Sequence, residues 1–346
     1  MLRYRFRTLI LLLVLLVPIV SLLSRPVHAQ KSSEGGTAAV ATLPPGTIYY
    51  TNAGQSWSMK GDGSGKSPSI AGEPSQVRHE GSRWFLKLQT ASSPQDDQWF
   101  ATNENNVRIQ LTSDPSVRHN GIPPAWSRDD TFFSYCGVYE TETEWVGRLF
   151  VVDLIWLDGL PIASAPTVVY ESRRPLLDEF GLMNYLGYDE VSLGRHDWSP
   201  VAYEAAVNRY VAGVGKVIDI MTFTDNVVSI RPLINQADLP SWSPDGNRIA
   251  YNRYRSSGYQ EIVDVWTINA DGTNNMQITK YIGGKQYNGT SQWLPTWSPT
   301  GTHLVFSERV ISGSKTTTNV ARVPAGGGTK VNLTSDGRSS YPRWRP

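Results

Sequence analysis

The chain has 346 residues, of which 40% are hydrophobic and 18% charged, and its formal net charge is +1. This near-neutral balance argues against a nucleic-acid partner, which requires positive charge gathered on one face. The single cysteine, Cys136, excludes an intrachain disulfide.

The first 29 residues have the three parts of a secretory signal peptide. Arg3, Arg5 and Arg7 precede an apolar run over residues 9–23, and Val27-His28-Ala29 offers a small-residue cleavage site. The run is shorter than the ~20 residues that span a bilayer, which favours cleavage over a retained anchor. Cleavage leaves 28 basic against 31 acidic side chains, a net charge near −3. The sequence thus predicts a secreted or periplasmic protein, with membrane contact limited to this segment if it is retained.

Residues 30–46 are predicted to form a flexible linker. They consist mainly of Ser, Gly, Ala, Thr and Pro, with too little apolar content to pack. The remaining segment, 47–346, is long enough for one large domain.

From residue 47 onward the chain repeats one unit. The segment Pro240–Tyr251 (PSWSPDGNRIAY) returns as Pro295–Phe306 and, more weakly, as Pro124–Tyr135. With two fragments and one degenerate copy, the anchor positions are Val77, Trp126, Trp198, Trp242, Trp297 and Trp344. A repeat at roughly 40–50 residues is typical of propeller blades.

The second half of each unit, two strands around a tight turn, gives an independent count. In the clearest copy Asp271-Gly272 supplies the positive φ angles of a short hairpin. These halves begin near Gln55, Asp97, Gly147, Lys216, Asp264 and Thr318, so both counts give six. We expect an all-β, six-bladed propeller in which the strand Ser340–Arg345 pairs with the amino-terminal strand near Thr47–Asn52 and closes the ring.

The anchor segments resemble TolB-type propeller repeats, whose signature is W-S-P-D-G-x-x-I-A-[YF]. The resemblance is strongest at Trp242 and Trp297 and extends over residues 47–346. It implies a scaffold role, since TolB propellers dock an envelope lipoprotein. We expect no counterpart of the α/β domain of TolB, because only the linker precedes the first strand, and none of the hydrolase domain of prolyl oligopeptidase relatives.

Most conspicuous side chains have structural explanations. The anchor tryptophans recur at one position of each blade, where a large ring fills the wedge between sheets. The Asp-Gly pairs fit tight turns and lack the ligand series of a calcium loop. No serine lies in a nucleophile-elbow motif, the histidines lack paired metal-ligand spacing, and Cys136 is expected to be a buried, inert thiol. The sequence therefore predicts no catalytic residue, no metal site and no cofactor.

The longer connections fall mostly on one face of the predicted disc. In a four-stranded blade the B–C and D–A connections lie on one side, and the A–B and C–D turns lie on the other. We expect long loops on the first side at Glu140–Glu144, Glu171–Asp197, Asn252–Gln260, Tyr281–Leu294 and Glu308–Thr317. Repeat proteins collect insertions on the binding face, so this side is the predicted binding surface.

Two of these loops supply the candidate binding residues. The interface anchors are Tyr188, Tyr287 and Trp293, because Tyr and Trp dominate binding energy at interfaces. The candidates for steering and orienting an acidic or polar partner are Arg173, Arg174 and Arg195, with His196 beside them. Equally, the loop Glu171–Asp197 could be a self-packed flap over the channel mouth.

The sequence favours a non-catalytic scaffold that binds a protein or cell-envelope component through the long-loop face. A second interpretation is a carbohydrate lyase or hydrolase at the channel mouth. Convergence of Arg195, His196 and an acid such as Asp189 or Glu190 around the axis would favour that enzyme. A third interpretation is the sensing of a small ligand.

Overall fold

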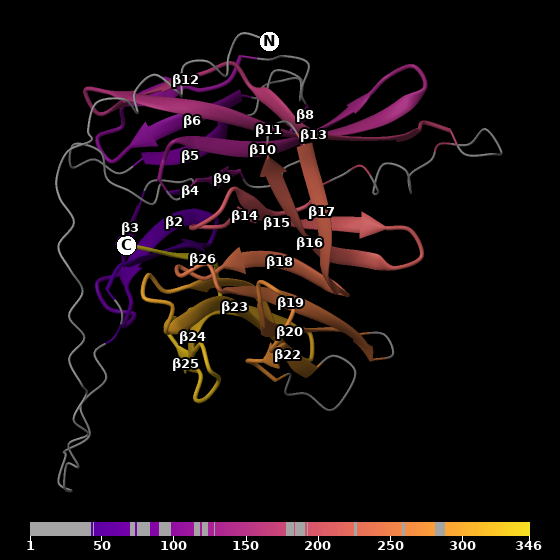
Figure 1. Ribbon diagram of the computed structural model, residues 1–346. Coiled ribbons are helices and arrows are strands. Elements are labelled where there is room, and N and C mark those ends of the chain that lie inside the picture. Colours follow the sequence, from indigo (N-terminus) through magenta and orange to yellow (C-terminus); the bar gives the residue numbers. More distant parts are fainter. Residues whose placement is uncertain are drawn as a thin grey trace, which may run out of the picture. The chain divides into compact units, whose positions relative to one another are not determined.

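Every secondary-structure element in the described part of the chain is a β-strand (Figure 1). The structure is a computed structural model that describes residues 43, 45–69, 73–74, 84–89, 98–113, 118–119, 124–127, 129–177, 183, 191, 193–224, 227–257, 260–280 and 288–346. At 73–74, 118–119, 255–257, 260–262 and 288–290 it describes the backbone alone. The predicted signal peptide, and the predicted linker up to residue 42, lie outside the described residues.

The strands form six antiparallel sheets, which we number as blades I to VI. Blade I consists of β26 (Ser339–Arg345), β1 (Thr47–Asn52), β2 (Gln55–Lys60) and β3 (Ser67–Pro68). Blade II consists of β4 (Glu73–Pro74), β5 (Trp84–Gln89), β6 (Gln98–Asn103) and β7 (Arg108–Gln110). Blade III consists of β8 (Arg118–His119), β9 (Ala125–Trp126), β10 (Phe132–Glu140), β11 (Glu144–Leu157), β12 (Leu160–Ala163) and β13 (Thr167–Pro175).

The other three blades have four strands each, in chain order. Blade IV consists of β14 (His196–Trp198), β15 (Glu204–Val211), β16 (Gly215–Thr224) and β17 (Val227–Asn235). Blade V consists of β18 (Ala237–Trp242), β19 (Arg248–Ser257), β20 (Gln260–Asn269) and β21 (Met276–Gln277). Blade VI consists of β22 (Asn288–Trp297), β23 (His303–Ser312), β24 (Lys315–Pro324) and β25 (Val331–Asn332). This confirms the predicted fold class, an all-β, six-bladed propeller.

The first strand of each blade borders the propeller axis. Strands β14, β18, β22 and β26 contact one another in succession, as the innermost strands of adjacent blades must. Blade I takes its inner strand from the other end of the chain, because β26 pairs antiparallel with β1, with Ile48 opposite Trp344 and Asn52 opposite Ser339.

The repeated tryptophans pack between neighbouring blades, as predicted. All five anchor tryptophans are buried, and Trp297 of blade VI packs against Ala250 and Val265 of blade V. The Nε1–H group of Trp297 donates to the carbonyl of Ser241 in blade V, at 2.9 Å. Because the ring contributes both apolar contact and a hydrogen bond, it holds two sheets together.

A second, polar contact between blades was not foreseen from the sequence. In blades IV, V and VI the second strand contains three consecutive buried residues (205–207, 249–251 and 304–306). The side chain that follows them hydrogen-bonds to the inner strand of the next blade. Asn208 donates to the Ala237 carbonyl at 3.2 Å. Asn252 donates to the Gln292 carbonyl at 2.8 Å and accepts from the Leu294 amide at 2.9 Å. We call Asn208, Asn252 and Ser307, whose hydroxyl accepts from the Tyr341 amide at 2.8 Å, the latch residues.

The two faces of the propeller differ in how far the strands project. The turns after the inner strands form the short-turn face, and the hairpins β10–β11, β15–β16, β19–β20 and β23–β24 form the long-hairpin face. In Figure 1 the ends of the hairpins β10–β11 and β15–β16 lie to the right, and the end of β26 lies to the left.

Several segments predicted as loops on the long-hairpin face are strands. Strand β19 runs to Ser257 and β20 starts at Gln260, so the expected loop Asn252–Gln260 is almost entirely paired, and β10 and β11 leave only 141–143 of Glu140–Glu144 unpaired. The same holds for most of Glu308–Thr317 and for Glu171–Pro175. The loop prediction was wrong there because it was based on polar side chains. Two polar segments can still pair as strands, since each supplies hydrogen-bond partners for the N–H and C=O groups of the other.

We expect removal of residues 340–346 to abolish cooperative unfolding. The deletion takes away most of β26 and leaves β1 with an unpaired edge and blade I without its buried Trp344. Thermal unfolding followed by circular dichroism measures the effect, and removal of Pro346 alone, which lies outside β26, is the control. A deletion variant that melts as sharply and at the same temperature as the full chain would contradict this expectation.

We expect Asn252→Ala to destabilise the fold by roughly 2–4 kcal/mol. The change leaves the Leu294 amide and the Gln292 carbonyl buried without their partner, and an unsatisfied buried group costs about 1–3 kcal/mol. Urea unfolding measures the loss, with the exposed Thr316→Ala as a control that should stay within ~0.5 kcal/mol of the parent. Equal midpoints for the two variants would show that the latch contributes nothing.

Candidate functional site

The inner strands of blades V, VI and I bulge at one level of the channel, three residues before the anchor tryptophan. There Leu239, Leu294 and Tyr341 have φ values of 58°, 57° and 55°, and each precedes a proline. Positive φ is uncommon for bulky side chains and persists where the surroundings enforce it. Here hydrogen bonds enforce it, because the latch residues Asn252 and Ser307 hold the amides of Leu294 and Tyr341.

The equivalent position in blade IV is Arg195. The equivalent positions in four consecutive blades are thus the half-buried Arg195, which directly precedes β14, the half-buried Leu239, the buried Leu294, and Tyr341, which is 57% exposed. Tyr341 is the most accessible of these four side chains. Sequence reasoning selected Arg195 but missed Tyr341, although the spacing from the anchor tryptophan was available.

Charged and aromatic side chains surround this rim of the channel. Asp238 is buried and accepts from Lys216 Nζ at 2.8 Å and from the Tyr254 hydroxyl at 3.2 Å. The guanidinium of Arg309 lies 5.6 Å from the ring centre of Trp293, a cation–π contact. The predicted anchor Trp293 is therefore half-buried in the rim, with one face of its ring already occupied.

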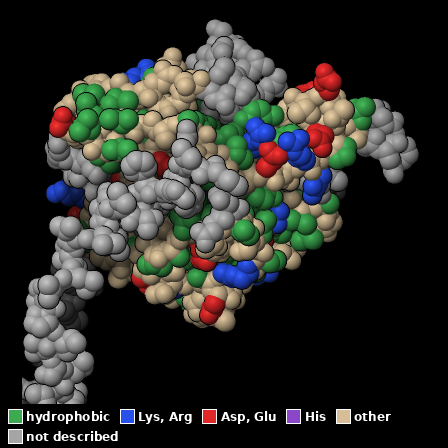
Figure 2. Space-filling view, turned by 45° about the horizontal axis from the view of Figure 1, so that its top comes forward, with side chains coloured by type: hydrophobic (Ala, Val, Ile, Leu, Met, Phe, Trp, Pro, Cys, Tyr) green, Lys and Arg blue, Asp and Glu red, His purple; other side chains and the backbone are tan. Residues whose placement is uncertain are grey.

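A separate charged cluster lies on the long-hairpin end of blade III. Arg173 binds Glu144 at 2.8 Å and Glu171 at 2.7 Å, and Arg148 binds the other oxygen of Glu171 at 2.6 Å. Burial alone would raise the pKa of Glu171, but the hydrogen bonds from Arg148 and Arg173 hold this pKa below its usual value. We call Glu144, Arg148, Glu171 and Arg173 the blade III charge cluster. In Figure 2 basic and acidic side chains alternate at the upper right, on the side where β13 lies in Figure 1.

The two neighbouring arginines of the prediction point to opposite faces of blade III. Arg173 is opposite Val146 and Arg174 is opposite Trp145, and successive side chains of a strand alternate between faces. Arg173 therefore belongs to the charge cluster, and Arg174 does not. The Arg174 side chain instead turns back to donate to the Arg173 carbonyl at 2.8 Å.

Those predicted site residues that the structure describes do not lie in one patch. Arg173 and Arg174 lie on the outer strand of blade III, whereas Trp293 lies on the inner strand of blade VI, on the opposite side of a six-membered ring. Arg195 lies just before β14 of blade IV, two blades away from Trp293, with blade V between them. Tyr188 and Tyr287 lie outside the described residues, so their positions stay predictions.

His196 is a core residue and not part of an exposed surface. It is 2% exposed, its Nε2 lies 2.7 Å from Ser134 Oγ, and its Nδ1 lies 3.7 Å from Cys136 Sγ. Burial, together with the nearby charge of Arg195, lowers the pKa of His196 to about 4. Burial also raises the pKa of Cys136 well above its usual value, so this thiol is inert, as expected.

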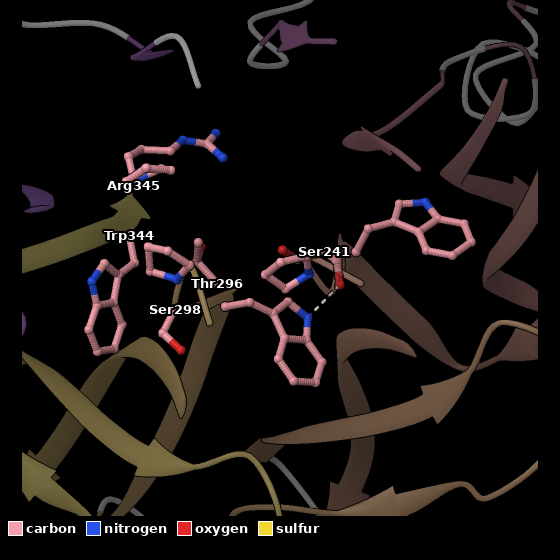
Figure 3. A pocket seen from close by; sticks show the side chains of 10 residues that line it. Ser241, Thr296, Ser298, Trp344 and Arg345 are labelled. Atoms are coloured by element: carbon pink, nitrogen blue, oxygen red, sulfur yellow. Dashed lines mark hydrogen bonds between the residues drawn. The ribbon is translucent and has the colours of Figure 1, made fainter. Parts of the chain in front are cut away.

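A small pocket lies at the opposite, short-turn mouth of the channel (Figure 3). It has about 120 Å³ and is lined by the ends of β18, β22 and β26, including Ser241, Thr296 and Arg345. In blades IV, V and VI a serine follows the anchor tryptophan and caps the turn, as Ser298 does by accepting from the His303 amide at 3.1 Å. Arg345 takes this position in blade I, so the pocket lies where the repeat is broken.

Within the described residues, no group of three or more His, Cys, Asp or Glu side chains is placed to hold a metal ion. No helix of the described part of the chain is long and apolar enough to cross a membrane.

Comparison with known proteins supports the fold. No family model and no curated protein matches the sequence. Among solved structures, a TolB from Acinetobacter baumannii matches with a TM-score of 0.57 and 15% identity, over 87% of this chain and 67% of that one. A candidate TolB from Agrobacterium tumefaciens matches with a TM-score of 0.54 and 15% identity, over 88% of this chain and 100% of that one.

The chain has the TolB-type propeller fold. At this level of identity the similarity concerns the fold alone. A GH74 xyloglucanase from Xanthomonas campestris matches over 84% of this chain and 44% of that one, with a TM-score of 0.47 and 10% identity, which is too distant to inform on activity.

We expect His196 to make the fold sensitive to mild acid. Above pH 6.5 the imidazole is neutral in both states, whereas between pH 6.5 and about 4 the unfolded chain alone takes up a proton. Stability therefore falls as the pH is lowered through this window, by about 2–3 kcal/mol at pH 4.5. Urea unfolding at pH 7 and pH 4.5 measures the fall, and His196→Gln, which cannot titrate, should lose that much less. Parallel losses in the two proteins would contradict the burial of a neutral imidazole.

Proposed function

We propose that this chain is an exported, non-catalytic scaffold that binds a protein or cell-envelope partner through its long-hairpin face. The observation that carries the proposal is the blade III charge cluster, which presents arginine on a projecting, rigid end of the propeller. The TolB-type fold supports a binding role in general, and the signal-peptide pattern of residues 1–29 supports export.

The charge cluster is built to hold Arg173 in place while leaving it accessible. The Arg173 side chain is 47% exposed, yet two carboxylates fix its guanidinium, and the partner strand β11 pairs residue by residue with β13 beneath it. A guanidinium fixed in this way loses little conformational entropy on binding and can still donate to an acceptor. The chemistry fits an acidic or polar surface.

The rest of blade III supports rigidity at this end. Arg148 lies over the ring of Tyr139, 4.9 Å from its centre, and the Leu176 amide donates to the Thr143 carbonyl at 2.8 Å across the hairpin end. Because rigid loops and hairpins on a scaffold carry most recognition sites, this end is a better binding platform than a flexible flap.

The carbohydrate-enzyme interpretation loses one of its residues. Convergence of Arg195, His196 and an acid around the axis would have favoured it, whereas His196 is buried between blades and hydrogen-bonded to Ser134. The proposed acids Asp189 and Glu190 lie outside the described residues. No observation on the described residues favours that interpretation over binding.

The experiment compares two adjacent arginines that face opposite sides of the same blade. The full chain is used to capture partners from an envelope extract, the captured partner is purified, and its Kd is measured by calorimetry for Arg173→Ala and Arg174→Ala. We expect Arg173→Ala to weaken binding about 30-fold, a hot-spot loss of ~2 kcal/mol. Arg174→Ala should change the Kd by less than about threefold, with both melting temperatures near that of the parent.

Two further variants separate the faces of the propeller. Lys66→Ala, on the short-turn side of blade I, should leave the Kd unchanged, and Trp293→Ala tests whether the channel rim takes part. Partner binding that survives Arg173→Ala but is lost with Lys66→Ala would place the partner on the opposite face and defeat the proposal. Cleavage of a glycan on an array incubated with the full chain would instead favour the enzyme.

A further inference from the structure

Strand β11 continues past the body of blade III and forms a ribbon with β12. The ribbon pairs Leu154 with Ala163, Ile155 with Ile162 and Leu157 with Leu160. Its turn is Asp158-Gly159, with φ values of 51° and 72°, as a two-residue hairpin requires. The ribbon lies at the other end of β11 from the charge cluster, so it is a different surface from the one in the proposed function.

One face of the ribbon is anchored to the core between blades II and III. Leu154 is buried in that core, with Trp156 and Ala163 packed against it. The Nε1–H group of Trp156 donates to the Asp130 carbonyl at 2.7 Å, and its ring centre lies 5.9 Å from that of Trp84. These contacts fix the ribbon, so its other face has a defined position.

The opposite face presents four aliphatic side chains to solvent. Ile155 is 70% exposed, Leu157 59%, Ile162 50% and Leu160 43%. They are cross-strand neighbours, so they form one contiguous patch on the order of a few hundred Å², the size of patch that marks an interaction site. In Figure 2 hydrophobic side chains gather at the upper left, the side on which β12 lies in Figure 1.

The free edge of the ribbon is protected against strand pairing. The Ser164 amide donates to the Asp153 carbonyl at 2.9 Å, so the alternation of an antiparallel ladder directs the amide position of residue 161 away from β11. This residue is Pro161, which has no N–H group to offer a further strand. Pro161 therefore removes one of the outward donors of β12, which disfavours extension of the sheet by a second copy and favours contact through the face.

Carboxylates lie at both ends of the apolar patch. Asp153 precedes Ile155 on the same face, and Asp158 forms the turn at the tip; both are exposed, and neither has an ion-pair partner among the described residues. At ~3.4 Å per residue the two lie about 17 Å apart along the strand. These charges oppose contact with an anionic lipid surface and complement a partner that is cationic at both ends of an apolar stripe.

We propose that the outer face of the β11–β12 ribbon docks an amphipathic helical segment of a partner protein, with aliphatic side chains along one face and a Lys or Arg near each end. A helix of about 11 residues spans the same ~17 Å as the two carboxylates. The patch is smaller than the ~800 Å² that each partner contributes to a standard interface, so the ribbon fits a single helix at micromolar affinity.

The test uses the full chain and two synthetic helical peptides of about three turns, with leucines at i, i+3, i+4 and i+7. One peptide has lysine at both ends and the other has glutamate. Fluorescence anisotropy should give a micromolar Kd for the lysine peptide and at least tenfold weaker binding for the glutamate peptide. Ile155→Thr combined with Ile162→Thr should weaken the lysine peptide at least tenfold, since threonine keeps strand propensity and removes the apolar face.

The matched control is Val227→Thr combined with Ile230→Thr, which removes two exposed aliphatic side chains from β17 of blade IV and should leave the Kd unchanged. Asp158→Asn keeps the turn, since Asn-Gly also adopts it, and should weaken the lysine peptide and reduce its salt dependence. Equal binding of the two peptides, or equal losses in the ribbon and control variants, would overturn the proposal. Ribbon-dependent binding to anionic vesicles or ribbon-dependent dimerisation, without peptide binding, would overturn it in favour of a membrane or a second copy. The outcome with Arg173→Ala does not enter this test, so the two proposals can fail separately.

Discussion

The latch between blades is the interaction that ties the bulged inner strands of the channel to their neighbouring blades. Each inner strand of blades V and VI bulges before its proline, and a bulge leaves backbone groups without partners in their own sheet. From the preceding blade, Asn252 supplies a partner for the Leu294 amide in the bulge of β22, and Asn208 binds the Ala237 carbonyl just before the bulge of β18. The corresponding position in blade III is Cys136, a weak hydrogen-bonding group that faces His196. Because the Cys136 thiol is a weak hydrogen-bonding partner, it does little to stabilise a protonated His196, whose pKa burial already lowers.

The sequence predicted the fold well because its signals are local and repeated. The spacing of Trp242, Trp297 and the weaker anchors determines the number of blades, and turns such as Asp271-Gly272 mark the hairpins inside each blade. The site was harder to predict, because polar composition was taken as a sign of loops. Arg173 and Arg174 looked like one basic pair, whereas strand alternation separates them, and only the register with Val146 and Trp145 shows which one joins the charge cluster.

Other features depend on contacts between distant parts of the chain, which no local pattern contains. His196 falls within the predicted loop Glu171–Asp197 and was a candidate binding residue, yet it is buried and contacts Ser134 and Cys136 of the preceding blade. The exposed ribbon can be recognised in the sequence, since Ile155, Trp156 and Leu157 are consecutive apolar residues and therefore point to both faces of the strand. A strand with one solvent face alternates between apolar and polar residues, so apolar residues on both faces indicate two covered surfaces. In the structure one of the two faces is open.

Blade III departs furthest from the repeat, and one strand connects its two unusual ends. Strand β11 has 14 residues and extends from the charge cluster at Glu144 to the apolar ribbon at Leu157. The same rigid strand thus carries a charged surface toward one face of the propeller and an apolar surface toward the other. The two surfaces that we propose for recognition, at opposite ends of one strand, would hold two partners at a fixed separation without any conformational change.

The pairing of β26 with β1 has a consequence for biogenesis. The two strands are separated in sequence by almost the entire propeller. Their contact therefore closes a very long loop, and the entropic cost of loop closure grows with loop length. A chain is synthesised amino end first, so β1 is complete long before its partner strand β26 has been made. During that interval the edge of β1 and the apolar surface that Trp344 later covers are open to solvent. Chaperones that bind newly made chains, or folding of blades II to VI ahead of blade I, would protect this edge until the last strand arrives.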